Sequence, residues 1–227
     1  MKNTGVGEAL EGELEERQVR VSGTVTLEGT LGITKNPLGL VVFAHGSGSG
    51  RHSPRNRYVA KMLRNSRLST LLIDLLTAEE EAVDMHTMHL RFDIHLLAKR
   101  LMEATDWVQR NPDTQTLAVG YFGASTGAAA ALVAAAERSD YVKAVVSRGG
   151  RPDLAGPSLP HVKAPTLLIV GGDDFPVIDI NKDALEQLHC EKKLVIVPGA
   201  THLFEEPGKL QEVARLAAEW FKQYLTR

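Results

Sequence analysis

The stretch from Leu117 to Ala131 constrains the fold more than any other part of this chain. An apolar run, LAVGYF, ends in the pattern G-x-S-x-G, and an alanine-rich run follows at once. This order predicts a strand, a tight turn with Ser125 at its tip, and a helix that starts directly after the turn. Gly123 and Gly127 lie two residues on either side of the serine, where we expect a side chain to collide with the neighbouring strand or helix. The pentapeptide G-x-S-x-G is common by itself, but its position between a strand pattern and a helix pattern is typical of a nucleophile elbow.

Other parts of the chain alternate between strand and helix patterns. Continuous apolar runs are typical of strands that are buried on both faces, and they occur at Leu40–Ala44, Ser69–Asp74, Leu117–Phe122, Lys143–Ser147, Pro165–Val170 and Lys193–Val197. Helical patterns lie between them, at Arg57–Asn65, Asp93–Gln109, Ala124–Glu137, Ile178–Leu188 and Pro207–Leu225. Val19–Val25 and Thr26–Ile33 alternate around glycines and predict an antiparallel edge hairpin. The whole predicts an α/β fold with a mostly parallel sheet and helices on both faces.

Length and charge narrow the class of protein. We expect one domain over residues 1–227. A net charge of −2 gives no reason to expect nucleic acid or an anionic membrane as a partner. Cys190 is the one cysteine, which excludes an internal disulfide and fits a reducing compartment. The acidic N-terminus has no apolar leader segment, and no run is long enough to span a membrane. We therefore expect a cytoplasmic protein, either a monomer or a homodimer.

The candidate site consists of polar residues that follow the apolar runs, because ligands of such folds bind beyond the carboxyl ends of the strands. The loop HGSGSG, which begins at His45, follows the first buried strand. Ser125 follows the central run, the pair Asp173 and Asp174 follows a later one, and His202 follows the last. Serine, aspartate and histidine in this order match the chain order of the α/β-hydrolase triad.

These residue types fit acyl transfer. A serine hydroxyl is a weak nucleophile near neutral pH, so it needs a base, and His202 is the candidate. The imidazole needs a carboxylate to hold its tautomer, which Asp174 or Asp173 would supply. Negative charge that develops on the carbonyl oxygen needs backbone N–H donors. We expect these from Thr126, the residue after the serine, and from Ser47 in the first loop.

Several neighbouring residues are candidates for substrate binding. His45 is expected to shape the Ser47 loop by hydrogen bonding rather than to act as a base. Positive charge is concentrated in the loop RHSPRNR, which contains Arg51 and Arg55, and Arg148 follows another strand. These arginines either form local salt bridges or recognise a carboxylate or phosphate of the substrate.

Two other interpretations fit the sequence less well. His86, His89 and His95 match no known metal-binding spacing and are more typical of a solvated helix face. The loop GSGSG resembles a phosphate cradle but lacks the nucleotide-binding fingerprints. We expect neither a metal nor a cofactor.

Four motifs together resemble the dienelactone-hydrolase-like α/β-hydrolases, in a bacterial branch that also occurs fused to phosphoribosyltransferase domains. They are FAHGSGSGRHSPRN (43–56), GYFGASTGAAAA (120–131), SRGGRPD (147–153) and LIVGGDDFPVI (168–178). The resemblance covers nearly the whole chain. It implies an eight-stranded sheet whose second strand is antiparallel, and a triad of Ser125, Asp174 and His202. Dienelactone hydrolase proper has a cysteine nucleophile, whereas this chain has a serine.

The expected activity is that of a carboxylesterase-type serine hydrolase. Its substrate would be a small ester, lactone or thioester, cleaved through an acyl-enzyme. The segment 148–161 is short and rich in proline and glycine, which predicts an open site with a minimal lid. A non-catalytic binding protein of the same fold is one alternative. An acyltransferase or perhydrolase with the same triad is another.

Overall fold

The computed structural model describes residues 15–226, and its centre is a twisted eight-stranded sheet. The strands are β1 (Glu15–Ser22), β2 (Thr26–Ile33), β3 (Gly39–Ala44), β4 (Leu68–Ile73), β5 (Val119–Ala124), β6 (Val142–Arg148), β7 (Thr166–Gly171) and β8 (Lys192–Val197). Their order is β1-β2-β4-β3-β5-β6-β7-β8. β2 pairs antiparallel with both neighbours, and the remaining pairs are parallel. The predicted fold class and the antiparallel second strand are confirmed. The expected absence of a leader segment concerns residues that lie outside the described part of the chain.

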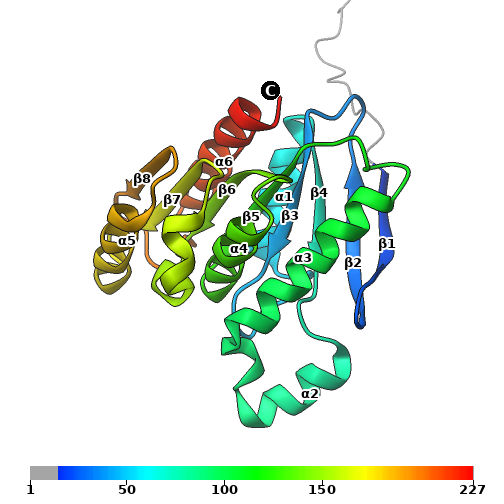
Figure 1. Cartoon of the computed structure of the whole chain (residues 1–227). Helices are drawn as coiled ribbons and strands as arrows, with labels where there is room; N and C mark the ends of the chain where they lie inside the picture. Colours follow the sequence, from blue (N-terminus) through cyan, green and yellow to red (C-terminus); the bar gives the residue numbers. More distant parts are fainter. Residues whose placement is uncertain (1–14, 227) are drawn as a thin grey trace, which may run out of the picture.

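Helices cover both faces of the sheet (Figure 1). They are α1 (Pro54–Asn65), α2 (Ala78–Thr87), α3 (Ile94–Arg110), α4 (Thr126–Glu137), α5 (Phe175–Gln187) and α6 (Lys209–Leu225), with short 3-10 segments η1 (Leu90–Phe92) and η2 (Pro152–His161). One hydrophobic cluster joins α1 and α6 to one face. A second cluster joins α3, α4, η2 and α5 to the other face.

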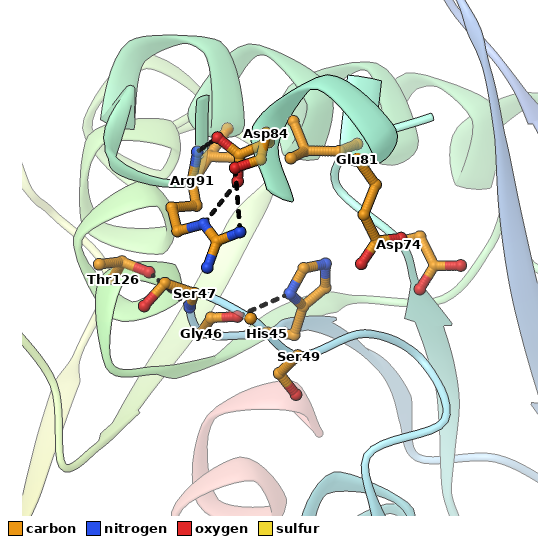
Figure 2. Close-up of a pocket in the computed structure, with 12 residues that line it drawn as sticks. His45, Gly46, Ser47, Ser49, Asp74, Glu81, Asp84, Arg91 and Thr126 are labelled. Atoms are coloured by element: carbon orange, nitrogen blue, oxygen red, sulfur yellow. Dashed lines mark hydrogen bonds and ion pairs between the residues drawn. The ribbon is translucent and has the colours of Figure 1, made fainter. Parts of the chain in front are cut away.

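The segment formed by α2 and η1 was not predicted from the sequence. α2 begins with a capping box. The Thr77 hydroxyl accepts from the Glu80 N–H, and the Glu80 carboxylate accepts from the Thr77 N–H. Asp84 is the buried residue of this helix, and the other side chains are largely exposed, so an apolar stripe is lacking. Figure 2 shows that Asp84 and Arg91 of this segment face the loop that follows β3. The segment therefore lies at the same edge of the sheet as the candidate site.

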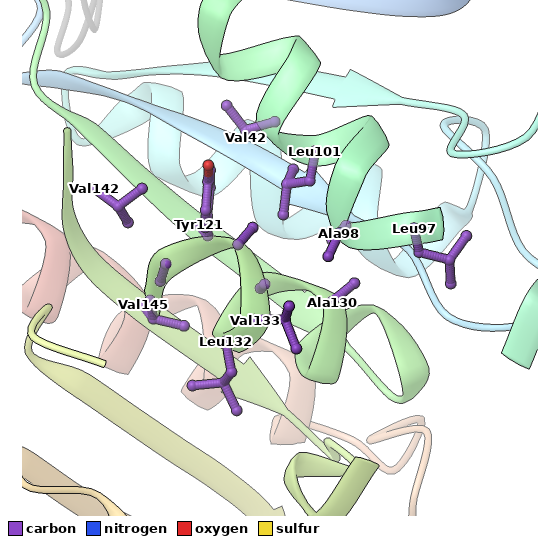
Figure 3. Close-up of a cluster of buried hydrophobic side chains, with 14 of the residues drawn as sticks. Val42, Leu97, Ala98, Leu101, Tyr121, Ala130, Leu132, Val133, Val142 and Val145 are labelled. Atoms are coloured by element: carbon purple, nitrogen blue, oxygen red, sulfur yellow. The ribbon is translucent and has the colours of Figure 1, made fainter. Parts of the chain in front are cut away.

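The larger core packs two helices onto the centre of the sheet (Figure 3). Tyr121 of β5 is fully buried there, and its hydroxyl lies 2.6 Å from that of Thr105 on α3. The buried face of α4 consists mainly of alanines, whose small side chains allow close approach to the strands. This close approach fixes the start of α4 relative to β5, and the elbow lies between them.

Several boundaries differ from those predicted. β1 starts earlier, at Glu15, and ends at Ser22 rather than Val25. β5 extends to Ala124 and α4 starts at Thr126, whereas we expected the strand to end at Phe122 and the helix to start at Ala124. Alanine has a high helix propensity, but parallel pairing of Ala124 with Arg148 places it in the strand. The segment 152–161, expected as a loop, forms the 3-10 turns of η2.

Candidate active site

Ser125 occupies the tight turn between β5 and α4. Its backbone has φ 51° and ψ −123°, a conformation that non-glycine residues rarely adopt. A Cβ at Gly127 would lie 2.2 Å from the carbonyl oxygen of Ala44 on β3. A Cβ at Gly123 would lie 2.4 Å from the Cα of Ala128 on α4. The predicted steric need for both glycines is confirmed, and the turn presents the serine at the carboxyl end of the sheet.

The loop after β3 packs directly against this turn. A Cβ at Gly46 would lie 2.9 Å from the Cβ of Ser125, so the loop backbone passes close to the serine. The Ser47 N–H donates to the Thr126 hydroxyl over 3.0 Å. The structure thus brings together the two residues predicted to supply backbone donors. In this arrangement the Ser47 amide is already engaged by the side chain of Thr126, a contact that the sequence did not indicate.

His45 holds this loop through both of its ring nitrogens. The Leu75 N–H donates to Nε2 over 2.9 Å, which assigns the proton to Nδ1, and Nδ1 lies 2.9 Å from the Gly46 carbonyl oxygen. Burial lowers the pKa of His45 below its ordinary value of 6.5, because the charged ring would lose its hydration. The neutral ring therefore has no free nitrogen to offer a substrate.

A small cavity lies behind the loop (Figure 2). Its volume is about 30 Å³, and its lining includes Ser47, Thr126, Asp84 and Arg91. The guanidinium of Arg91 bonds the Asp84 carboxylate at 2.5 Å and lies against Gly48. A space of this size holds about one or two water molecules. The cavity is therefore too small for a substrate, and Asp84 and Arg91, which line it, support the loop.

His202 and Asp174 form a hydrogen-bonded pair. Asp174 lies directly before α5, after β7, and its Oδ2 is 2.7 Å from His202 Nδ1. The Asp174 side chain is 13% exposed and the His202 side chain 40% exposed, so the carboxylate is enclosed while the imidazole reaches the surface. Asp173, the alternative that the residues alone left open, is exposed. With Nδ1 facing the carboxylate, Nε2 is free to face outward.

The loop that carries His202 is fixed by its own residues. Phe204 has a positive φ of 58° and is fully buried among the side chains of α1 and α6. Thr201 bonds the Glu206 carboxylate through both its backbone N–H and its hydroxyl. These hydrogen bonds lower the pKa of Glu206 because they favour its charged form. The buried Phe204 and the hydrogen bonds of Thr201 to Glu206 thus fix the loop on both sides of His202.

One loop, residues 148–151, contacts both the serine and the histidine. The Ser125 N–H donates to the Arg148 carbonyl over 3.3 Å, and the Arg151 N–H donates to the Ser125 carbonyl over 3.1 Å. Gly149, with φ 50°, lies against His202, since a Cβ there would be 3.1 Å from its carbonyl oxygen and 3.5 Å from the ring. Asn181 of α5 steadies the loop by donating to the Gly150 carbonyl over 3.0 Å. In the sequence, the glycine pair of the SRGGRPD motif indicated this loop. No sequence pattern indicated that Asn181 would bond it.

The predicted arginines have different environments. Arg51 donates to both carboxylate oxygens of Asp74, through its backbone N–H and its guanidinium. Arg55 bonds Glu205 at 2.6 Å. Arg148 is buried, and no salt bridge of it occurs among the described residues. Two of the three arginines are therefore bound to carboxylates of the chain itself.

Other features lie away from these residues. Cys190 bonds the Thr166 hydroxyl before β8, at the opposite edge of the sheet, and burial raises the pKa of its thiol. His86, His89 and His95 are exposed. Over residues 15–226, no three side chains of His, Cys, Asp or Glu are grouped to hold a metal ion. In the same part of the chain, no helix has the length and apolar character needed to cross a membrane.

The fold and the turn at Ser125 define an α/β-hydrolase-type protein. Comparison with known proteins identifies its family. The model of the dienelactone hydrolase family matches residues 59–225. This chain belongs to the dienelactone hydrolase family. A crystal structure of dienelactone hydrolase from Anabaena variabilis is 67% identical, with a TM-score of 0.92, covering 93% of this chain and 99% of that one.

Two further similarities differ in what they support. A protein of Mycobacterium tuberculosis (strain H37Rv) with the provisional name phosphoribosyl transferase is 58% identical over 211 residues, which cover 93% of this chain and 46% of that protein. This chain thus spans about half the length of that relative, whose named activity belongs to the longer protein. Est1E from Butyrivibrio proteoclasticus has a TM-score of 0.77 at 16% identity, covering 92% of this chain and 99% of that one, and shares the fold.

Proposed function

We propose that this protein is a serine hydrolase that cleaves small carboxylic esters, lactones or thioesters through an acyl-enzyme. The observation that carries the proposal is the 2.7 Å bond between Asp174 and His202 at the sheet edge where Ser125 occupies its strained turn. The loop 148–151, which bonds Ser125 and contacts His202, supports a common site for the two residues. Membership of the dienelactone hydrolase family supports the same reaction class.

The mechanism assigns one role to each residue. Asp174 keeps the His202 proton on Nδ1, so Nε2 accepts the proton of the Ser125 hydroxyl as its oxygen attacks the carbonyl carbon. The negative charge that forms on the carbonyl oxygen is stabilised by the N–H groups of Thr126 and Ser47. His202 then gives the proton to the leaving alcohol. Water repeats the sequence on the acyl-enzyme and releases the acid.

The Ser47 amide requires one local change in this mechanism. Its bond to the Thr126 hydroxyl must be shared with, or exchanged for, a bond to the substrate oxygen. A hydroxyl rotates at little cost, and its own proton can also point at the new negative charge. The removal of one such donor costs about 2.7–4 kcal/mol of transition-state stabilisation in a comparable site. Thr126→Val would report on this contact.

A small substrate fits the surroundings of the pair. Phe175 and Leu203 directly follow Asp174 and His202, and their exposed fractions are 68% and 38%. They offer apolar contact to a short acyl or aryl group, at about 0.8 kcal/mol per buried methylene. η2, which follows β6, is compact and does not form a long cap.

The decisive experiment is covalent labelling with a fluorophosphonate, followed by peptide mapping. We expect one labelled residue, Ser125, together with an initial burst of p-nitrophenol from a short p-nitrophenyl ester. Ser125→Ala should lose both signals and keep the far-UV circular dichroism of the parent. If the folded parent protein is not labelled and hydrolyses no ester in a panel of acyl lengths, the fold serves a binding role instead.

A further inference from the structure

A basic hollow lies between helix α1 and the hairpin of β1 and β2, apart from the candidate active site. The hairpin forms one edge of the sheet and pairs with β4, on which α1 packs (Figure 1). The volume of the hollow is about 770 Å³, which lies within the range of about 300–1,000 Å³ that is usual for small-molecule sites. Ser125, Asp174 and His202 are not among the residues that line it.

The hairpin supplies a polar side of the hollow. Glu16 and Gln18 point to the same face of β1, because side chains alternate along a strand. Gln18 is paired across the ladder with Thr30 of β2, whose hydroxyl donates to the Gln18 side-chain oxygen over 3.3 Å. All three side chains line the hollow. They offer amide, hydroxyl and carboxylate groups, so this side suits a polar ligand rather than an apolar one.

The opposite side of the hollow, which α1 supplies, is basic. Four of the twelve residues of α1 are arginine or lysine and none is acidic, whereas the whole chain has a net charge of −2. Arg57, Lys61 and Arg64 follow one another at intervals of four and three residues, so they lie on one face of the helix. All three line the hollow. Like charges at this spacing destabilise a helix, so the row is favourable only where negative charge balances it.

Ion pairs with the chain itself balance both ends of the hollow. Arg51, which precedes α1, bonds Asp74 through its backbone N–H and its guanidinium. Arg64, in the last turn of α1, bonds Glu16 at 2.9 Å and the Thr70 hydroxyl at 3.0 Å. The Arg64 side chain is only 9% exposed, so its guanidinium is held in place. These bonds fix α1 against β1 and β4, and the hollow is therefore preformed.

Arg57 and Lys61 lie between these ion pairs and have no carboxylate partner. Both are exposed, and neither side chain forms a salt bridge or a hydrogen bond within residues 15–226. Arg57 is close enough to act on Arg64, since burial lowers the pKa of Arg64, Glu16 raises it, and the charge of Arg57 lowers it. Two positive charges thus remain unbalanced at one place on a chain whose net charge is negative.

We propose that this hollow binds a small molecule with two or more linked phosphate groups. About one turn of helix separates Arg57 from Lys61, so both cations can reach one compact polyanion. The Arg57 guanidinium suits paired hydrogen bonds to phosphate oxygens, and the Lys61 ammonium adds a point charge. A polyphosphate fits better than an acidic protein segment, because the unbalanced charge is confined to one helical turn in a hollow of small-molecule size. The binding is separate from ester cleavage, since none of these side chains takes part in the proposed mechanism.

The test measures binding to the folded protein by isothermal titration calorimetry at low ionic strength. Pyrophosphate and adenosine triphosphate are the two phosphate probes, one without and one with a nucleoside, and citrate offers a similar negative charge as carboxylates. We expect one of the two phosphate probes to bind one site per chain with a Kd below about 1 mM, at least about tenfold more tightly than citrate. The affinity should fall as salt is added, because salt screens exposed charges.

A pair of double variants locates the site. Arg57→Gln with Lys61→Gln removes the two unbalanced charges, and we expect the Kd to rise at least about tenfold. Lys99→Gln with Arg110→Gln is the matched control, since it removes the same charge from exposed positions on α3, on the other face of the sheet. The control should keep the Kd within about twofold of the parent. Without ligand, the first variant should melt no lower than the parent, because repulsion along α1 is relieved, so unfolding cannot explain its loss of binding.

Three outcomes would overturn the inference. The parent could bind neither phosphate probe at concentrations up to about 10 mM. The two double variants could lose affinity equally, which would show a general attraction between charges. Citrate could bind as tightly as the phosphates, which would show no preference for phosphate. Ser125→Ala should bind like the parent, and binding that is lost in Ser125→Ala but kept without Arg57 and Lys61 would place the ligand in the candidate active site instead.

Discussion

The substitution Gly127→Ala tests the elbow most directly, because two physical effects predict opposite signs for the change in stability. Gly127 lies within α4. In an exposed helix, alanine is more favourable than glycine by about 1 kcal/mol, so propensity alone predicts a more stable protein. The structure predicts the reverse. A Cβ at this position would lie 2.2 Å from the Ala44 carbonyl oxygen and 2.4 Å from the His45 carbonyl oxygen.

Both contacts are to backbone atoms, so a side-chain rotation cannot relieve them. They fall short of an ordinary van der Waals distance by about 1 Å, and α4 must move away from β3 by a similar amount. Overpacking of this kind costs about 1–3 kcal/mol. After subtraction of the propensity gain of about 1 kcal/mol, we expect the free energy of unfolding to fall by up to about 2 kcal/mol.

The same shift displaces Ser125 and Thr126 from the loop after β3. A misplacement of about 1 Å in a catalytic group lowers the rate by about 10²-fold. Urea unfolding followed by circular dichroism and kcat/KM on a short p-nitrophenyl ester measure the two effects. Gly208→Ala is the control, since Gly208 has φ 83° but a Cβ there would meet no atom within 4 Å, so it isolates backbone strain. A Gly127→Ala protein that is more stable than the parent, with full activity, would refute the steric account.

Two further predictions concern the histidines. Asp174→Asn should lower kcat by up to about 10⁴-fold with little change in folding, because the amide favours the wrong tautomer of His202. The control Asp173→Asn should change kcat less than twofold. Equal effects of the two substitutions on kcat in steady-state assays would contradict the assignment of Asp174. Burial lowers the pKa of His45 below 6.5, so the unfolded chain takes up this proton first as the pH falls. The stabilising effect of the neutral ring is thus complete above about pH 6.5 and is lost below it, with a slope of at most about 1.4 kcal/mol per pH unit. Urea unfolding between pH 5 and 8 should show a shallower pH dependence for His45→Asn than for the parent, and an unchanged slope would exclude His45 as its source.

Local patterns predicted the parts of the fold that depend on nearest neighbours in the chain. The apolar runs located six strands, of which five are buried while β8 is a largely exposed edge strand, and the glycines around Ser125 predicted the turn. α2 was missed because its stability comes from the Thr77 capping box and from Asp84 rather than from an apolar stripe. Element ends were also less predictable, as at Ala124, where pairing with Arg148 outweighs helix propensity.

The sequence by itself determined the α/β class, the turn that holds Ser125, and the set of polar residues at the strand ends, because periodicity and steric limits act over a few residues. Only the tertiary structure decided which groups meet. Asp174 rather than Asp173 contacts His202, and Arg51 and Arg55 are bound to Asp74 and Glu205, while no carboxylate of residues 15–226 pairs with Arg148. Pairing of this kind depends on distances between residues far apart in the chain, and these distances follow from how the helices pack on the sheet.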